Sequence, residues 1–328
     1  MSEPFVLSFE PILKPKVWGG SNLDRLFGLR LPESQAGGLG EAWLCCDMPE
    51  GRSPVRGTDH TLTDFVQEWG DGLLGGIELF EGSFPLLLKL LDANDDLSVQ
   101  VHPDEAMARR MGVRLKHEAW YIVEARGDAV IYRGLHAEVT PDRLAEACRT
   151  GQVAGLLKRI VVSPGECYYL PSGTLHALGA GVVVAEIQTP SDVTYRLFDW
   201  NRLGTDGKPR ELHVEAGLEA THFGPQPPNP FTAPPNPRWP GARRLVACPS
   251  FVADEVALPA GAAQRSVAEM LTWIVLAGGV RLSDGRGGWL DVAPGRACVV
   301  PAALGTLRVE ASAGGARLIE VTGPRHGD

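Results

Sequence analysis

The sequence predicts a mainly β protein built from small antiparallel modules. Its apolar residues fall into short runs rich in valine, leucine and isoleucine, and turns that contain glycine or proline separate these runs. The chain of 328 residues holds 39 glycines and 26 prolines, so such turns are frequent. This pattern is typical of sandwiches, jelly rolls and barrels made of many short strands. The clearest runs are residues 84–92, 97–103, 119–125, 128–134, 155–173 and 181–189.

Helical patterns are fewer than strand patterns. One candidate begins at Thr61 and has apolar residues at helical spacing, and another begins with Pro-Asp-Glu at residue 103. A third has Thr140 as its cap, followed by a proline in the first turn. These are recognised signals for the start of a helix. We therefore expect a few helices, packed on the N-terminal β module, over residues 61–75, 103–112, 140–157 and 209–220.

A proline-rich stretch marks the clearest domain boundary. Prolines cluster between residues 225 and 240, and proline cannot donate a hydrogen bond within a sheet. The chain then returns to strand-like runs. We expect a catalytic domain over residues 1–224, a linker over 225–241 and a smaller β module over 242–328.

A weak internal repeat links the two expected modules. Gly165 is followed after five residues by Pro171, then by Gly173 and His176. In the second half Gly295 is again followed after five residues by a proline, but no histidine comes after it. We interpret the C-terminal module as a degenerate copy that keeps the turn and lacks metal ligands.

Composition excludes several classes of function. The formal net charge of −9 argues against a nucleic-acid partner, because phosphate backbones need a positive surface. No signal-peptide pattern and no apolar run long enough to span a bilayer are visible, so we expect no membrane association. The six cysteines include no Cys-x-x-Cys pair, which favours reduced thiols in a cytoplasmic protein.

Polar residues alternate along one predicted strand. In Ser-Val-Gln-Val-His-Pro, residues 98–103, the side chains of Ser98, Gln100 and His102 share one face. The turn that leads to His176 resembles the second sequence motif of the cupin superfamily, whose fold is the double-stranded β-helix or jelly roll. The first cupin motif supplies two nearby ligands and then a glutamate, which here is Glu118.

The resemblance implies that Gln100, His102, Glu118 and His176 converge on one metal ion inside a barrel. Two imidazoles, a carboxylate and an amide oxygen suit zinc, and iron(II) accepts a similar set. The adjacent His117 is expected to face the other way along its strand. The other histidines lack partners in the sequence.

Longer matches point to one family. The chain resembles the class I, zinc-dependent mannose-6-phosphate isomerases of the bacterial short form, within the cupin superfamily. The resemblance implies one Zn²⁺ per chain on the four residues above, an active-site arginine at Arg196, and Lys89 and Glu186 in the same cavity. The chain has Gly-Glu-Ala-Trp at 40–43, where the family commonly has serine in place of alanine, and it lacks the long helical insertion, so its phosphate ligands are not defined. The matching segments are residues 14–20, 40–43, 84–105, 117–123, 171–179 and 186–202.

Each cavity residue has more than one interpretation. Lys89 lies in an apolar run and either binds substrate oxygens, shuttles a proton or extends to solvent. The fork of Arg196 suits an enediolate or a phosphate, unless it pairs with Asp192 or Asp199. Glu186 is a candidate base or ring-opening group, or it orients Lys89.

Three further residues are expected around the cavity. Trp18 and Lys16 are placed at the mouth of the barrel, where Trp18 either contacts substrate or only packs. The Ser98 hydroxyl is a candidate contact for the phosphate.

The sequence therefore predicts an aldose–ketose isomerase of carbohydrate metabolism. It interconverts mannose 6-phosphate and fructose 6-phosphate by metal-assisted proton transfer through an enediolate. The alternatives are an iron-dependent cupin dioxygenase and a non-catalytic sugar-binding cupin. The oligomeric state is not indicated by the sequence.

Overall fold

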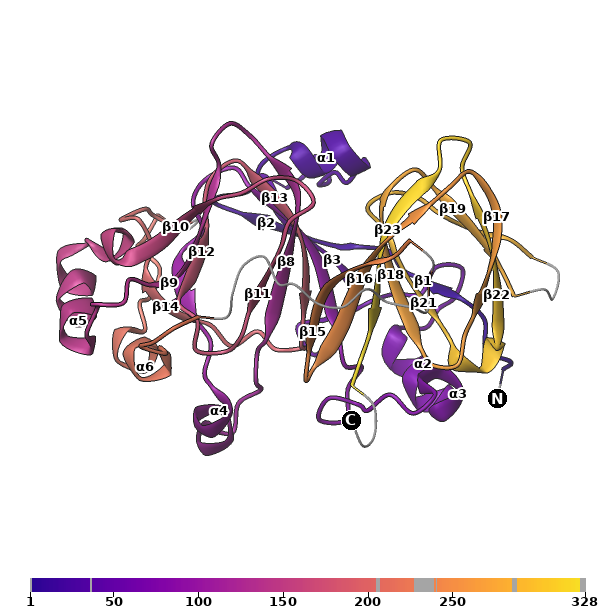
Figure 1. Cartoon of the computed structure of the whole chain (residues 1–328), viewed down its shortest axis with the longest axis horizontal. Coiled ribbons are helices and arrows are strands. Elements are labelled where there is room, and N and C mark those ends of the chain that lie inside the picture. The colour runs from indigo at the N-terminus through magenta and orange to yellow at the C-terminus, as the bar shows by residue number, and fades with distance from the viewer. Residues whose placement is uncertain are drawn as a thin grey trace.

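The computed structural model describes residues 2–35, 37–204, 207–226, 239, 241–284 and 288–324. These residues form antiparallel sheets with a few short helices, which confirms the predicted mainly β fold. Figure 1 shows two groups of strands side by side. The domain boundaries at residues 224 and 241 stay predictions. Most of the expected linker, 227–238 and 240, lies outside the described residues.

The first group of strands consists of two sheets that enclose an apolar interior. Trp120 and Leu91 from one sheet share a buried cluster with Ile131 and Leu178 from the other. The six-stranded sheet has the order β11 (Cys167–Leu170), β8 (Glu118–Ala125), β13 (Val182–Gln188), β6 (Leu87–Ala93), β3 (Gly38–Cys45), β2 (Ile12–Lys16). The five-stranded sheet has the order β10 (Leu157–Val161), β9 (Val130–Leu135), β12 (His176–Leu178), β7 (Val99–Val101), β14 (Tyr195–Phe198).

The second group is also a pair of sheets around its own apolar cluster, which includes Trp273 and Leu307. Its six-stranded sheet has the order β1 (Leu7–Ser8), β21 (Ala297–Val300), β18 (Leu271–Ala277), β23 (Ala316–Thr322), β16 (Phe251–Leu258), β15 (Arg243–Cys248). Its four-stranded sheet has the order β17 (Gly261–Ser266), β22 (Thr306–Ala311), β19 (Val280–Ser283), β20 (Leu290–Val292). A separate hairpin pairs β4 (Asp47–Met48) with β5 (Gly51–Arg52).

The central strands β6 and β13 explain the nearly continuous apolar runs in the sequence. Every residue of both strands is buried, because each face of the sheet is covered. Leu88 and Ile187 belong to a core shared with strands of the second group, such as Val321. The alternate side chains face the interior of the first group, and Lys89 and Glu186 are paired directly across this face. Two charged residues therefore occupy interior positions of an otherwise apolar layer.

The helices agree with the expected positions along the chain, and one more is present. The first predicted segment divides into α2 (Leu62–Trp69) and α3 (Asp71–Leu74), and the third divides into α5 (Pro141–Thr150) and a 3₁₀ turn (Val153–Leu156). Thr140 caps α5 as expected, since its Oγ1 accepts a hydrogen bond from the Arg143 amide. The remaining helices are α1 (Asn22–Phe27), which the sequence analysis missed, α4 (Glu105–Met111) and α6 (Val214–Ala220).

One helix, α3, also packs against the second group of strands. We predicted all helices on the N-terminal module, but α3 packs against the 3₁₀ turn Ala302–Leu304, and the Met270 amide donates to the Leu74 carbonyl. The reason is the N-terminal segment, which joins the second group as β1 and brings Phe5 against Phe65 and Trp69 of α2. Figure 1 shows α2 and α3 beneath these strands.

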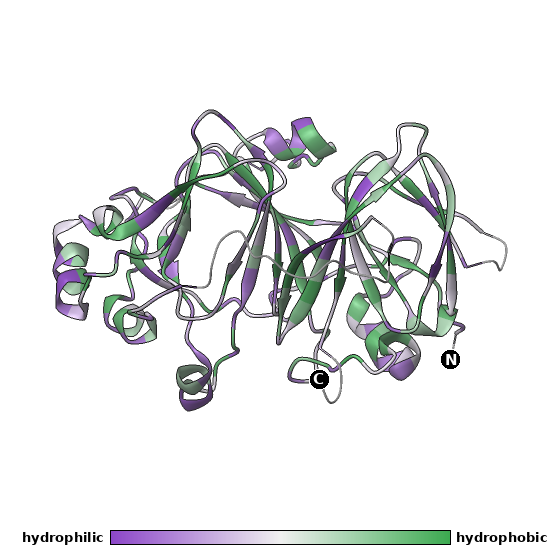
Figure 2. Ribbon diagram, viewed as in Figure 1, coloured by the Kyte–Doolittle hydropathy of each residue, from purple (hydrophilic) through white to green (hydrophobic). Residues whose placement is uncertain are grey.

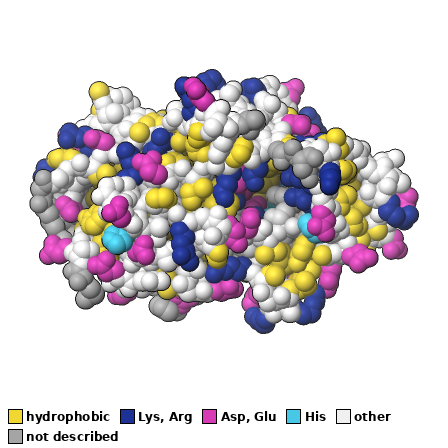
Figure 3. Space-filling model, turned by 180° about the vertical axis from the view of Figure 1, so that it is seen from behind, with side chains coloured by type: hydrophobic (Ala, Val, Ile, Leu, Met, Phe, Trp, Pro, Cys, Tyr) yellow, Lys and Arg dark blue, Asp and Glu magenta, His cyan; other side chains and the backbone are white. Residues whose placement is uncertain are grey.

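Hydrophobic residues concentrate along the strands (Figure 2), and charged residues of both signs lie at the surface (Figure 3). Figure 2 shows hydrophobic residues along the strands of both groups, with hydrophilic residues frequent on the peripheral helices. In Figure 3 basic and acidic side chains are interspersed over one face of the molecule. Among the described residues, no helix is both long and apolar enough to cross a membrane. All six cysteines are free thiols.

Two backbone segments of the first group of strands cross closely at Gly19 and Gly38. An alanine at position 38 would place its Cβ 2.1 Å from the Gly19 carbonyl oxygen, so the two segments can approach only as glycines. This crossing holds Trp18, which is buried and lines the cavity described below.

We expect Gly38→Ala to lower the free energy of unfolding by about 1–3 kcal/mol, because one segment must move away from the other. Urea denaturation measures the loss. Gly155→Ala is the matched control, since its added Cβ meets nothing within 4 Å. Equal stabilities of the two variants would contradict the crossing.

Candidate metal centre

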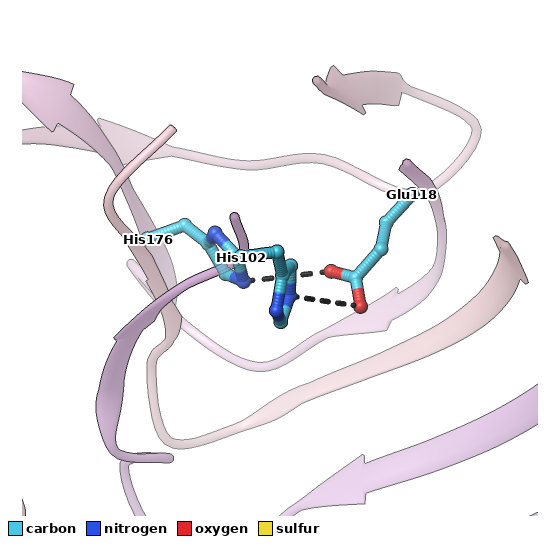
Figure 4. A group of neighbouring side chains, drawn as sticks. All are labelled: His102, Glu118 and His176. Atoms are coloured by element: carbon cyan, nitrogen blue, oxygen red, sulfur yellow. Dashed lines mark ion pairs between the residues drawn. The ribbon is translucent and has the colours of Figure 1, made fainter. Parts of the chain in front are cut away.

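Three predicted ligands meet inside the first group of strands. His102 follows β7, while Glu118 and His176 open β8 and β12. The Nε2 atoms of His102 and His176 lie 3.3 Å and 3.4 Å from the two carboxylate oxygens of Glu118. Figure 4 shows the two rings and the carboxylate pointing toward one another from separate strands. Each residue is about 1% exposed, and the candidate ligand atoms all lie within 4.8 Å of one another.

Backbone carbonyls orient both imidazole rings. His102 Nδ1 lies 2.8 Å from the Val193 oxygen, and His176 Nδ1 lies 2.7 Å from the Thr174 oxygen. A carbonyl oxygen can only accept, so each Nδ1 carries the proton and each Nε2 presents its lone pair to the centre. This is the tautomer that binds a metal through Nε2, with the other nitrogen held by an outer partner.

The atoms facing the centre lack hydrogen-bond partners. Among the described residues, His102 Nε2 and both oxygens of Glu118 are buried and make no hydrogen bond of acceptable geometry. Glu118 Oε1 lies 2.8 Å from the Lys116 ammonium, whereas His102 Nε2 and Glu118 Oε2 have no hydrogen-bond partner in the described part of the chain. Unpaired polar atoms are costly in a protein interior, so these two facing one point indicate a missing ligand. A divalent cation fits a site with this donor set.

Gln100, the fourth predicted ligand, lies beside the other three. It is paired with His176 across β7 and β12, and its side-chain nitrogen lies 3.4 Å from His176 Nε2. The structure therefore brings together all four residues predicted from the sequence. Their action as ligands stays a prediction.

The electrostatics favour the metal-binding protonation states. Burial, together with the nearby Lys116 ammonium, lowers the pKa of His102 to about 3, and burial also lowers the pKa of His176. Both rings are therefore neutral at neutral pH. Burial alone would raise the pKa of Glu118, but the adjacent Lys116 ammonium opposes it, and this pKa lies well below its usual range. A neutral pair of imidazoles faces an ionised carboxylate.

Lys116 is the principal residue that the sequence analysis missed. Its Nζ lies 2.8 Å from Glu118 Oε1, and the side chain is only 4% exposed. The signal was present, because Lys116 and Glu118 are two residues apart and share a face when the chain is extended. His117, between them, points elsewhere and accepts a hydrogen bond from the Ser172 amide through Nδ1.

A cavity of about 280 Å³ borders the cluster of candidate ligands, and two of them, Gln100 and Glu118, line it. Its lining is dominated by charged and polar side chains rather than apolar ones. The predicted residues that line it are Lys16, Trp18, Lys89, Ser98, Gln100, Glu118, Glu186 and Arg196. The lining also contains polar residues that the sequence analysis did not place there: Glu41, Lys116, Thr194 and Arg210. Asp192 lines the cavity as well, although it was considered only as an ion-pair partner of Arg196.

Lys89 is a buried cation and does not extend to solvent. It is 5% exposed, and its Nζ lies 3.2 Å from Glu186 Oε2. Burial opposes the charged form, but the carboxylates of Glu186 and Glu41 outweigh it and raise the pKa of Lys89 above its ordinary value. An ammonium held between these carboxylates is placed to bind negative oxygens of a ligand.

Arg196 has no carboxylate partner among the described residues within ion-pair distance, so the predicted alternative of a pair with Asp192 or Asp199 does not hold. Its strand pairs with β7 such that Arg196 lies opposite Gln100. One guanidinium nitrogen, Nη1, donates to the Glu211 carbonyl at 2.9 Å, while Nε is buried without a partner. Asp199 instead binds two other arginines, Arg202 and Arg210. The fork of Arg196 is therefore available to an anionic ligand.

Comparison with known proteins connects this site to a family. The Streptococcus mutans mannose-6-phosphate isomerase is 34% identical over 290 residues, which cover 87% of this chain and 88% of that protein. The chain belongs to the type I phosphomannose isomerase family. A sequence model of the catalytic domain of type I phosphomannose isomerase matches residues 6–130.

Other members of the family support the assignment. The probable mannose-6-phosphate isomerase GmuF of Bacillus subtilis is 41% identical over 225 residues, covering 67% of this chain and 68% of that protein. The crystal structure of a mannose 6-phosphate isomerase from Bacillus subtilis superposes with a TM-score of 0.85 at 32% identity, over 97% of this chain and 99% of that one. The predicted family and fold are thus confirmed.

Proposed function

We propose that this phosphomannose isomerase family member interconverts mannose 6-phosphate and fructose 6-phosphate, with zinc held by Gln100, His102, Glu118 and His176. The observation that carries the proposal is the buried His–Glu–His cluster at one side of a cavity whose lining holds five cations and four carboxylates. A phosphorylated sugar is anionic, and its reaction develops further negative charge, so the lining suits both.

Zinc fits the donor set. Two imidazole nitrogens with free lone pairs, one ionised carboxylate and one amide oxygen form a mixed nitrogen–oxygen site, in which three to four protein ligands leave room for substrate. A related structure, at 17% identity, is described as a mannose 6-phosphate isomerase bound with zinc and yttrium. When bound, the metal supplies Lewis-acid polarisation of the sugar's carbonyl and hydroxyl oxygens.

The cations of the chain hold the substrate and its developing charge. Interconversion of an aldose and a ketose removes a weakly acidic proton from C2 and returns it at C1, through an enediolate. Lys89, fixed as an ammonium, binds sugar oxygens at the floor of the cavity. Arg196 presents a planar fork to an enediolate or phosphate oxygen. Ser98 and Trp18, both buried at the lining, contact the substrate beside them.

The alternatives predict different chemistry. An iron-dependent dioxygenase consumes O₂, and a non-catalytic sugar-binding protein leaves the substrate unchanged. No observation in the described part of the chain favours either one over the isomerase. One zinc ion per chain and a cytoplasmic location stay predictions.

Metal removal tests the proposed function. We expect the purified protein to convert mannose 6-phosphate to fructose 6-phosphate in a coupled assay, to lose that activity after dialysis against a chelator, and to regain it with Zn²⁺. Elemental analysis before and after dialysis measures the metal, and Mg²⁺ is the control addition, because it prefers six oxygen ligands and should not restore activity. Full activity in metal-free protein, or bound iron with O₂ uptake, would refute the proposal.

A further inference from the structure

The two groups of strands repeat the same local pairing. β11 pairs with β8 such that Leu170 lies opposite Glu118, and β21 pairs with β18 such that Val300 lies opposite Leu271. Leu170 and Val300 each immediately precede the proline of the internal repeat. The next strand in each group begins five residues after that proline. The pairing therefore assigns equivalent positions in the two groups residue by residue.

None of the four candidate ligands has a metal-binding counterpart in the second group. Leu271 stands at the position of Glu118, and Thr306 stands at the position of His176. Thr306 is paired with Ser266, as His176 is paired with Gln100. Two residues beyond Ser266 stands Ala268, where His102 stands two residues beyond Gln100. That the second module as a whole lacks metal ligands stays a prediction.

A buried tryptophan–glutamate pair occurs at equivalent positions in both groups. Two residues after Glu118 and Leu271 stand Trp120 and Trp273, and each is paired with a glutamate on the next strand. Trp120 Nε1 donates to Glu186 at 2.8 Å, and Trp273 Nε1 donates to Glu320 at 3.0 Å. All four side chains are buried.

Each glutamate also receives a buried cation, although from a different strand. Lys89 on β6 lies 3.2 Å from Glu186, whereas Arg265 on β17 lies 2.6 Å from Glu320. The position of Lys89 is taken in the second group by Asp254, which is the residue paired with Glu320 on β16. The tryptophan, the glutamate and a cation thus form a unit that exists without any metal ligands around it.

Both oxygens of Glu186 are engaged in this unit. Oε1 accepts from Trp120, and Oε2 faces Lys89. Taking a proton from a sugar carbon would neutralise the carboxylate and leave the buried Lys89 ammonium beside an uncharged acid, which is costly in a low-dielectric interior. The equivalent carboxylate in the second group, Glu320, also binds a tryptophan and a buried cation, although its described neighbours include no metal-ligand set like that around Glu186. We infer that Glu186 is a positioning residue, which holds the Lys89 ammonium in the cavity and does not carry the proton.

This inference rests on the proposed isomerase function and is tested by a double-mutant cycle. We expect Glu186→Gln to lower kcat/KM for mannose 6-phosphate by about 10–100-fold, the usual effect of losing an orienting partner. The acidic limb of the pH profile of kcat/KM is expected to persist, and the zinc content to stay at the wild-type level. In a Lys89→Met background the same substitution should change kcat/KM by less than about twofold, because its effect acts through Lys89.

Glu320→Gln is the matched control, since it breaks the same unit in the second group. It should lower the unfolding temperature while leaving kcat/KM within about twofold of wild type. The inference is overturned if Glu186→Gln removes the acidic limb, or if it causes a further large loss in the Lys89→Met background. Should Lys89→Met fall below detection, the pH profile of Glu186→Gln decides. Absence of isomerase activity in the zinc-loaded wild type would instead refute the proposed function.

Discussion

Replacement of Glu118 by glutamine is expected to abolish zinc binding and to lower kcat/KM by about 10³-fold or more. The substitution removes the only carboxylate among the four candidate ligands, and metal assistance contributes several kcal/mol to the stabilisation of such transition states. It also leaves the buried Lys116 ammonium without its anion, so the free energy of unfolding should fall by about 3–5 kcal/mol. Elemental analysis, the coupled assay and urea denaturation measure the three effects.

Glu124→Gln provides the control for this prediction. Glu124 lies on the same strand, β8, and pairs with Arg25 at the surface. We expect it to leave both zinc content and turnover unchanged. Retention of full metal content by Glu118→Gln would show that the carboxylate is not a ligand.

Arg196→Ala is expected to lower kcat by about 10²–10³-fold while zinc content stays at the wild-type level. The guanidinium lies opposite Gln100 and has a buried Nε without a partner, so it is placed to stabilise charge that develops on the substrate. Its contact with the Glu211 carbonyl keeps the side chain in place. Steady-state kinetics and elemental analysis on the same preparation measure both quantities.

Two further variants separate the charge of Arg196 from its shape. Arg196→Lys keeps the charge and loses the fork, and we expect it to recover only part of the activity. Arg159→Ala, at an exposed position on β10, should behave as wild type. Loss of zinc in Arg196→Ala would contradict a purely catalytic role, because the residue would then support the metal site.

The features predicted well from the sequence are those set by local geometry. Alternation along an extended chain places Gln100 and His102 on one face, and the structure shows both beside His176. The glycine–proline turn before His176 determines where the next strand starts. Helix caps such as Thr140 are equally local. Each of these features depends on residues only a few positions apart in the chain, so it can be predicted directly from the sequence.

The features missed depend on contacts between distant segments. The sequence does not show that Glu41 and Lys116 face the same cavity as Lys89, because that depends on the order of strands in the sheets. The placement of α2 and α3 depends on Phe5, which is carried to them by the pairing of the N-terminal segment. Hydrophobic pattern determines which face of a strand is buried, but not which strand becomes its neighbour.

The pairing of β1 with β21 has a consequence for synthesis of the chain. Leu7 lies opposite Val299, so this strand acquires its neighbour only after the roughly 290 residues between them have been made. At translation rates of about 5–20 residues per second, this delay is on the order of 15–60 s. During that interval the segment around Leu7 and Phe9, both fully covered in the finished fold, stays open to other contacts. Bulky fusions at the N-terminus should therefore impair assembly more than equivalent fusions at an exposed loop.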